Sequence, residues 1–304
     1  MNFKKVLKNS FIHQMYKKLI IILSKYSPIL ASKVKYFVSF GKRLDLNNPK
    51  TFNEKLMWLK LFEDDTIKAM CADKYEVRNF VSSLGLGDIL NELYFVYESV
   101  DEIDFDKLPN SFVIKCTHGC GCNIICSDKS KLNKEDAMRK LDKWMKTDYS
   151  LLSAEPHYAK IKPRIIVEKF LGEEGGLSPI DYKIHCFHGE PKLIEVVLDR
   201  AINQTKFIFL DLNWNVLPYN RHSVNLKTQI EKPDKLDEML DIARKLSSNF
   251  TYVRVDLYYY NGKIYFGELT FTPSACCHTH LFKDADYEIG KLLDLSKLKQ
   301  SPKF

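Results

Sequence analysis

The sequence predicts an α+β protein: a helical N-terminal part, a small α/β part, and a larger, mainly antiparallel β part with helices. Two observations lead to this class. Helix signals dominate the N-terminal part, whereas short β-rich runs divided by Gly, Pro and Asp follow Arg164. The sequence contains no internal repeat and no low-complexity tract.

The first predicted element is a basic amphipathic helix. Its apolar residues fall at helical spacing: Phe3, Leu7, Phe11, Met15, Leu19, Leu23 and Tyr26. Lysines lie on or beside the other face: Lys4, Lys5, Lys8, Lys17, Lys18 and Lys25. Two interpretations stay open. The helix packs its apolar stripe on the protein's own core, or it lies on an anionic bilayer.

Three further helices are expected in order. Thr51 and Glu54 have the spacing of a capping box, which opens a helix that runs to about Lys60. A second helix is predicted over 73–83, ending before Gly85. After an acidic, turn-rich stretch over 101–110, charge and apolar spacing predict a third helix over 133–145.

The predicted strands begin with the short apolar run Phe112-Val113-Ile114. After Arg164 the β-rich runs are 165–167, 182–187, 193–198 and 207–210. Pro233 at a first-turn position predicts a helix through Leu246. Two final strands, 251–259 and 263–270, flank Asn261-Gly262.

Composition places the chain among ordinary globular proteins. It has 304 residues, 45% hydrophobic and 28% charged, with a net charge of +7. This charge suits an acidic ligand, an anionic membrane or nucleic acid. We find no secretory signal, and the run Leu19–Leu23 is far too short for a transmembrane span. We therefore expect a cytoplasmic protein with reduced cysteines.

The stretch KCTHGCGCNIIC, residues 115–126, holds four of the eight cysteines. Their separations differ from those of structural zinc sites, which usually place C-x₂₋₄-C pairs apart. If 112–116 and 123–126 form a hairpin, the four thiolates do not converge easily. The stretch 276–280, CCHTH, is a further source of zinc ligands. Structural zinc is therefore a minor alternative.

Without its cysteines, the same stretch is a strand, Lys115, a flexible turn with Gly119 and Gly121, and a second strand. Glycines let backbone N–H groups approach phosphate oxygens, and a lysine adds charge beside them. The pattern is neither a Walker loop nor a dinucleotide fingerprint. A hairpin turn without a ligand has the same appearance.

Asp256 and Glu268 are acids in two aromatic β-rich strands. A two-residue turn at Asn261-Gly262 would pair Asp256 with Gly267 and put Glu268 on the other face. We predict instead a three-residue loop, 260–262, which pairs Asp256 with Phe266 and makes the two acids diagonal same-face neighbours. Oxygen ligands so placed can share Mg²⁺ with a polyphosphate. A two-residue loop would count against this shared site.

Five motifs in order resemble the TupA-like ATP-grasp family of bacterial surface-polysaccharide gene clusters. They are DKYEVRNFV (73–81), FVIKCTHGCG (112–121), IKPRIIVEKFL (161–171), DYKIHCFHGEPKLI (181–194) and VRVDLYYYNGKIYFGELTF (253–271). The resemblance runs from about Asn48 to Leu292. It implies an ATP-grasp fold, in which two α+β subdomains clamp ATP, with an N-terminal helical extension.

The resemblance also implies roles for single residues. Lys74 and Lys115 would reach the phosphates, and Gly119 and Gly121 would form the lid over them. The hinge that reads adenine would be Glu168, Lys169, Phe170 and Leu171. Lys183 would face the γ-phosphate or the acceptor. Arg254 is a second catalytic candidate. Asp256, Glu268 and Thr270 would form the metal site.

The sequence departs from the family pattern in three places. Thr270 stands where a common third metal ligand is Asn, and hydroxyl is the weaker ligand. The lid reads THGCGC at 117–122, where N-H-x-x-G-G is usual. The stretch TPSACCHTH at 272–280 lacks the expected glycines. Either water completes the metal shell or the activity is altered.

The division implied is 1–45 for the helical extension, 46–110 for an α-rich subdomain, 111–171 for the small subdomain with the lid, 172–292 for the large subdomain with the metal site, and 293–304 for a tail.

The chemistry implied is ATP- and Mg²⁺-dependent joining of an amine to a carboxylate through an acylphosphate. The acceptor would be a uronic acid or amino acid of a surface polysaccharide or of a lipid-linked glycan at the inner membrane face, and we expect no nucleic-acid partner. Arg200, Arg221 and Arg254 are candidates to hold its carboxylates, with His185 and His188 nearby. One alternative is a phosphotransferase or glycosyltransferase on the same scaffold. The other is a non-enzymatic module that binds zinc or docks on a membrane.

Overall fold

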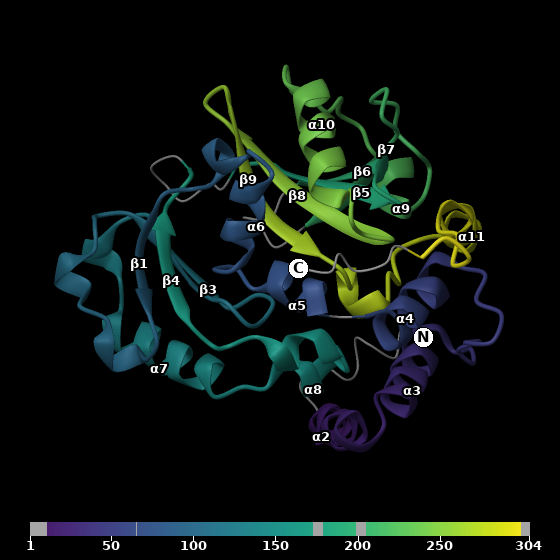
Figure 1. Cartoon of the computed structure of the whole chain (residues 1–304), viewed down its shortest axis with the longest axis horizontal. Coiled ribbons are helices and arrows are strands. Elements are labelled where there is room, and N and C mark those ends of the chain that lie inside the picture. The colour runs from purple at the N-terminus through teal and green to yellow at the C-terminus, as the bar shows by residue number, and fades with distance from the viewer. Residues whose placement is uncertain (1–10, 65, 173–178, 199–204, 299–304) are drawn as a thin grey trace.

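The computed structural model describes residues 11–64, 66–172, 179–198 and 205–298. In these ranges nine strands form two antiparallel sheets. The first has the order β1-β4-β2-β3, and the second has the order β7-β6-β5-β8-β9. Figure 1 shows the two sheets side by side, with α5 and α6 between them.

The strands of the first sheet are β1 (Leu93–Tyr97), β2 (Phe112–Cys116), β3 (Asn123–Cys126) and β4 (Ile165–Lys169). Those of the second sheet are β5 (Asp181–Phe187), β6 (Glu190–Leu198), β7 (Lys206–Leu210), β8 (Tyr252–Tyr260) and β9 (Lys263–Thr270). The predicted strands are all found. β1 was not predicted, although its sequence LYFVY is rich in aromatic and β-branched residues.

The α-helices in the described ranges are α2 (Phe11–Tyr26), α3 (Pro28–Phe40), α4 (Phe52–Phe62), α5 (Thr66–Ala72), α6 (Val77–Ser83), α7 (Lys134–Met145), α8 (Tyr149–Ser153), α9 (Arg221–Val224), α10 (Leu236–Ser247) and α11 (Lys283–Leu292). Short 3₁₀ segments include η5 (Pro156–Lys160) and η7 (Pro273–Cys276). None of these helices combines the length and the apolar content that crossing a bilayer requires.

The local helix signals have the expected geometry in most places. Thr51 and Glu54 form a complete capping box at α4, with Glu54 N–H donating to Thr51 Oγ1 at 3.2 Å. Asn133 caps α7. Two predicted starts are wrong, because the helices begin later, at Val77 and Leu236. Residues 73–76 form a turn instead, in which Asp73 Oδ1 accepts from the Tyr75 and Glu76 N–H groups.

Three apolar clusters cover most faces of the two sheets and so determine which face can carry a polar site. One fills the first sheet against α7. Another packs α10, α5 and α6 against one face of the second sheet. The third covers part of the opposite face with α3, α4 and α11, where the Phe52 ring packs on Phe187 and Tyr252. The remaining part of that face, toward the first sheet, carries the charged residues described next.

Candidate active site

Two adjoining cavities lie between the sheets. One is lined mainly by β4, the segment that follows it, and apolar side chains from both sheets. The other is lined by charged side chains and the β2–β3 turn. Lys115, Asn123 and Tyr258 line both cavities, so the two form one continuous site.

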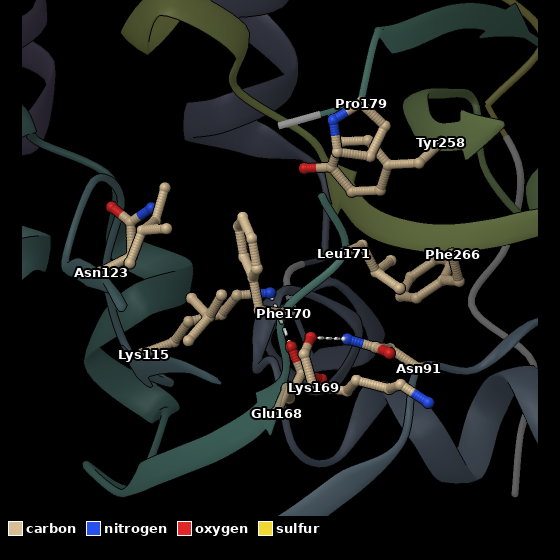
Figure 2. A pocket seen from close by; sticks show the side chains of 12 residues that line it. Asn91, Lys115, Asn123, Glu168, Lys169, Phe170, Leu171, Pro179, Tyr258 and Phe266 are labelled. Atoms are coloured by element: carbon tan, nitrogen blue, oxygen red, sulfur yellow. Dashed lines mark hydrogen bonds and ion pairs between the residues drawn. The ribbon is translucent and has the colours of Figure 1, made fainter. Parts of the chain in front are cut away.

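The apolar cavity is built around the end of β4. Phe170 and Leu171 lie there with Val113, Pro179 and Phe266. Figure 2 shows Tyr258 and Pro179 on one side of this cavity and Asn123 on the opposite side. The Lys169 carbonyl accepts a hydrogen bond from Asn91 Nδ2 at 2.8 Å, which holds the segment after β4 in place.

The Glu168 side chain joins three elements beneath this cavity. It is buried and pairs with Lys115 Nζ at 2.6 Å and with Arg78 Nη1 at 3.3 Å. Arg78 also donates to the Asn91 carbonyl at 2.8 Å. The sequence reasoning missed Arg78 and Asn91. Arg78 lies within the quoted motif DKYEVRNFV, but its partner Glu168 is 90 residues away.

The β2–β3 turn lies over the charged cavity. Lys74 Nζ donates to the Gly119 carbonyl at 2.6 Å, and Cys120 and Gly121 line the cavity. Gly121 has φ +73°, a conformation that favours glycine. A Cβ at Gly119 would stand 2.6 Å from the Tyr149 ring, so only glycine fits there.

The β8–β9 hairpin corrects the predicted register. Tyr260 pairs with Lys263, so the turn contains two residues, Asn261 and Gly262, and the predicted three-residue loop is wrong. Both turn residues have positive φ, as the tight hairpin turn requires. This turn alone would have put Glu268 on the wrong face.

A β-bulge at Gly267 reverses that outcome. Leu257 pairs with Phe266, whereas Asp256 pairs directly with Glu268. Gly267 has no partner, and a Cβ there would stand 2.8 Å from the Asp256 carbonyl oxygen. The bulge therefore brings the two carboxylates together on one face, as opposed rather than diagonal neighbours.

The carboxylates belong to an ion-pair cluster on β5, β8 and β9. Asp256 accepts from Lys183, and from Arg254 Nε and Nη2 at 2.6 Å each. Lys183 also pairs with Asp181 at 2.8 Å. Arg254 Nη2 reaches Glu268 at 3.5 Å and Thr270 Oγ1 at 3.1 Å. The antiparallel pairing of β5 with β8, which opposes Lys183 and Asp256, creates this cluster.

The cluster keeps its cations charged despite burial. Burial and Arg254 act to lower the pKa of Lys183, but Asp256 and Asp181 outweigh them and leave that pKa above its ordinary value. Burial likewise opposes the charge of Arg254, and Asp256 holds its pKa well above the usual range. These groups can therefore neutralise an anion without first taking up a proton.

The donor set at the charged end fits Mg²⁺. Asp256 and Glu268 supply carboxylate oxygens, the ligands that Mg²⁺ prefers, and Thr270 Oγ1 donates to Glu268 at 2.9 Å. Asp256 is 2% exposed and held by two cations, whereas the Glu268 side chain is 38% exposed. Glu268 is thus the more accessible ligand. In the described ranges, no three His, Cys, Asp or Glu side chains are grouped to hold a metal.

Most of the predicted site residues line the two cavities: Lys74, Lys115, Gly121, Glu168, Lys169, Phe170, Leu171, Lys183, Asp256 and Glu268. Gly119, Arg254 and Thr270 reach the site through the hydrogen bonds given above. The structure also adds Asp181, which sequence alternation with Lys183 could have indicated.

The remaining candidates lie elsewhere. Arg221 is exposed at the start of α9, and Arg200 is outside the described residues. His188 Nε2 accepts from the Asp294 N–H at 3.0 Å, which gives it a local structural role. His185 is buried and contacts the Tyr252 hydroxyl at 2.9 Å.

Comparisons with known proteins complete the description. A family model described as "TupA-like ATPgrasp" matches residues 54–294. No curated protein matches the chain. A solved D-alanine–D-alanine ligase from Bacillus anthracis with ATP has 17% identity and a TM-score of 0.40, covering 73% of this chain and 66% of that one.

Two other solved structures are similar to a comparable extent. The D-alanine–D-alanine ligase from Helicobacter pylori has 17% identity and a TM-score of 0.42, covering 74% of this chain and 60% of that one. A phosphoribosylamine–glycine ligase from Thermotoga maritima has 14% identity and a TM-score of 0.40, covering 70% and 52%. The chain spans less than two thirds of the length of these structures.

Proposed function

We propose, from the premise that this chain belongs to the TupA-like ATP-grasp family, that it is an ATP- and Mg²⁺-dependent ligase that joins an amine to a carboxylate. Membership makes the chain an ATP-grasp enzyme with the ATP-grasp fold. The reaction, the site roles and the substrates are our proposals.

One observation carries the proposal: an apolar cavity continues into a cavity with lysines and two opposed carboxylates. We assign adenine to the apolar cavity, where backbone groups of 168–171 read its edge and Phe170 and Leu171 cover its face. The phosphates then extend toward Lys74, Lys115 and the glycine turn. Asp256 and Glu268 would hold Mg²⁺, which would neutralise charge on the phosphates.

The chemistry needs positioning and charge neutralisation, and no side-chain nucleophile. A carboxylate oxygen of the acceptor attacks the γ-phosphorus, and the bond to the β-phosphate oxygen breaks to release ADP. The amine then attacks the acyl carbon of the acylphosphate, which expels phosphate, and the amine loses a proton as the amide forms. Lys183 and Arg254 stabilise the charge on the transferring group.

The proposed acceptor is the carboxylate of a uronic acid or amino acid in a bacterial surface polysaccharide. Its support is the resemblance of the sequence motifs described above, which implies a surface-polysaccharide context. An acidic, lipid-linked glycan also suits the net charge of +7.

Thermal unfolding with ATP and Mg²⁺ tests nucleotide binding. We expect a clear rise in the melting temperature of the wild-type protein, because a ligand at 100 times its Kd stabilises the folded state by about 2.7 kcal/mol. Glu268→Gln removes a metal ligand without burying a charge, so the rise should be much smaller. Lys245→Gln, on the exposed side of α10, is the control and should match the wild type. If ATP stabilises none of these proteins, the ATP proposal is wrong.

Product analysis then separates the reactions. A ligase releases ADP and phosphate only when carboxylate and amine are both present. ADP formation without amine and a stable phosphorylated acceptor would identify a phosphotransferase. Turnover that depends on a nucleotide sugar would identify a glycosyltransferase.

A further inference from the structure

The outer face of α2 and α3 is apolar and faces away from the protein. Helical spacing puts Phe11, Met15, Leu19, Ile22 and Tyr26 on one side of α2, and the first of them is 77% exposed. Ile29, Leu30 and Phe37 are exposed on α3, which packs against α2. We call these eight residues the N-terminal apolar face.

The side of α2 that packs inward is narrow. Its buried residues are Ile20 and Ser24, and α2 packs against α3 and α8. On α3 the buried residues are Ala31, Ser32 and Tyr36. Of the predicted stripe, Phe11, Met15, Leu19 and Tyr26 are exposed and Leu23 is half-buried, whereas Phe3 and Leu7 lie outside the described residues. The exposed part of the stripe does not join the core, which favours the bilayer interpretation over packing on the protein's own core.

The positive charge around the N-terminal apolar face limits which kind of partner can bind it. Lys18 and Lys25 are exposed beside the apolar side chains of α2, and Lys33 is exposed among those of α3. Residues 11–44 contain seven Lys and Arg and no Asp or Glu. Seven positive charges equal the whole net charge of the chain, because the other 39 basic side chains are matched by 39 acidic ones.

We propose that the N-terminal apolar face binds the surface of an anionic lipid bilayer. Apolar side chains enter the boundary between headgroups and acyl chains, and the lysines meet lipid phosphates. A second copy of the chain is a poorer partner, because pairing this face with itself would bring lysines together with no acid in residues 11–44 to balance them. Nucleic acid is also a poorer partner, because its bases could stack on the aromatic side chains but offer nothing comparable for the aliphatic ones.

Vesicle sedimentation of the full chain tests this proposal. We expect binding to vesicles of phosphatidylcholine with 30% phosphatidylglycerol, roughly ten-fold or more above binding to pure phosphatidylcholine. Lys18→Glu/Lys25→Glu should reduce binding to the anionic vesicles by about ten-fold or more. Ile22→Ser/Phe37→Ser should reduce it comparably, because it removes apolar side chains that enter the bilayer.

Matched controls use exposed side chains outside this face. Lys245→Glu/Lys291→Glu makes the same charge change on α10 and α11, and Val224→Ser removes an apolar side chain that is 58% exposed on α9. Both controls should bind like the wild type. Equal loss in the controls and the test variants would overturn the proposal, as would wild-type protein that ignores anionic vesicles.

Self-association is the remaining outcome to measure. Light scattering of the wild type that shows a dimer, abolished by Ile22→Ser/Phe37→Ser and unaccompanied by vesicle binding, would assign the face to a second copy and overturn the lipid proposal. The test is independent of ATP binding, so its failure leaves the proposed ligase activity standing.

Discussion

Gly267 occupies a position in the candidate site where the neighbouring backbone leaves no room for a side chain. It holds the bulge that turns Glu268 toward Asp256, and its missing Cβ makes room for the Asp256 carbonyl oxygen. An isolated glycine inside a strand suggests a bulge, but the sequence alone does not show which residues the bulge brings together. The glycine is visible in the sequence, but its need for space depends on the neighbouring strand.

Replacing this glycine should cost stability and metal binding together. We expect Gly267→Ala to lower the free energy of unfolding by about 1–3 kcal/mol, because the new methyl group overlaps the β8 backbone. The stabilisation by ATP and Mg²⁺ should also fall, because Glu268 moves. Urea denaturation with and without the nucleotide measures both effects.

Gly87→Ala is the matched control, since its Cβ would meet only Ser82 Oγ at 3.7 Å. It should leave the nucleotide response unchanged. A Gly267→Ala protein as stable and as responsive as this control would contradict the role that we give to the bulge.

Among the elements, the β2–β3 turn connects the two parts of the site. It is tied to Lys74 through the Gly119 carbonyl and packs on Tyr149, whose hydroxyl contacts the Cys122 thiol. Cys120 is exposed at its tip and lines the charged cavity. Bound phosphates would therefore lie against this thiol.

ATP with Mg²⁺ should protect Cys120 from alkylation. We expect the maleimide labelling rate of this thiol to fall by about ten-fold at saturating nucleotide, because a bound ligand excludes reagent from the cavity. Peptide mass spectrometry follows the site, and Cys120→Ser should remove the protected signal. Cys277, partly exposed and away from both cavities, is the internal reference. Equal labelling of Cys120 with and without ATP would mean that the turn does not cover the phosphates.

Elements with local sequence signals could be predicted, whereas features that depend on tertiary contacts could not. Thr51, Asn133 and the alternating strands carry their signals locally, so α4, α7 and β5–β9 could be predicted. The predicted three-residue loop between β8 and β9 was wrong because the pairing register depends on a bulge within β9, and the turn sequence does not reveal that bulge. The partners of Lys183 and Glu168 depend on strand order, and the inward side of α2 depends on what packs against it.

At the scale of the whole molecule, buried histidines in separate parts of the fold share one property. Burial lowers the pKa of His118 beside the first sheet, and of His185 and His278 in the second part. A lowered histidine pKa means that the unfolded chain binds more protons than the folded chain. Their contribution to stability is therefore complete above about pH 6.5 and declines as the pH falls below it.

His118→Asn should make unfolding less sensitive to acid. Raised carboxyl pKa values, such as that of Glu155, act with the opposite sign, so the comparison between variants isolates the histidine. The variant's free energy of unfolding should lie below that of the wild type, and this difference should shrink between pH 7.5 and pH 5. The decrease should be about 1.4 kcal/mol for each unit by which folding lowers the pKa of His118. Chemical denaturation across this range measures it. His13→Asn, on α2, is the control, and parallel curves for all three proteins would refute the prediction.

The bulge also determines which insertions and deletions in the β8–β9 hairpin would keep each side chain on its present face of the sheet. Ile264 and Phe266 contact the core under α10, whereas Glu268 and Thr270 face the cleft, so one strand reverses its parity at Gly267. Two residues added at the Asn261-Gly262 tip preserve that phase. Deleting Gly267 would also preserve it, because Phe266 and Glu268 would then oppose Leu257 and Asp256 in regular alternation. Pairing residue 267 with Asp256 would instead turn Glu268 into the core and Leu269 into the cleft. The facing of the two carboxylates therefore depends on residue 267 staying out of the strand pairing, and not on how many pairs of residues the tip contains.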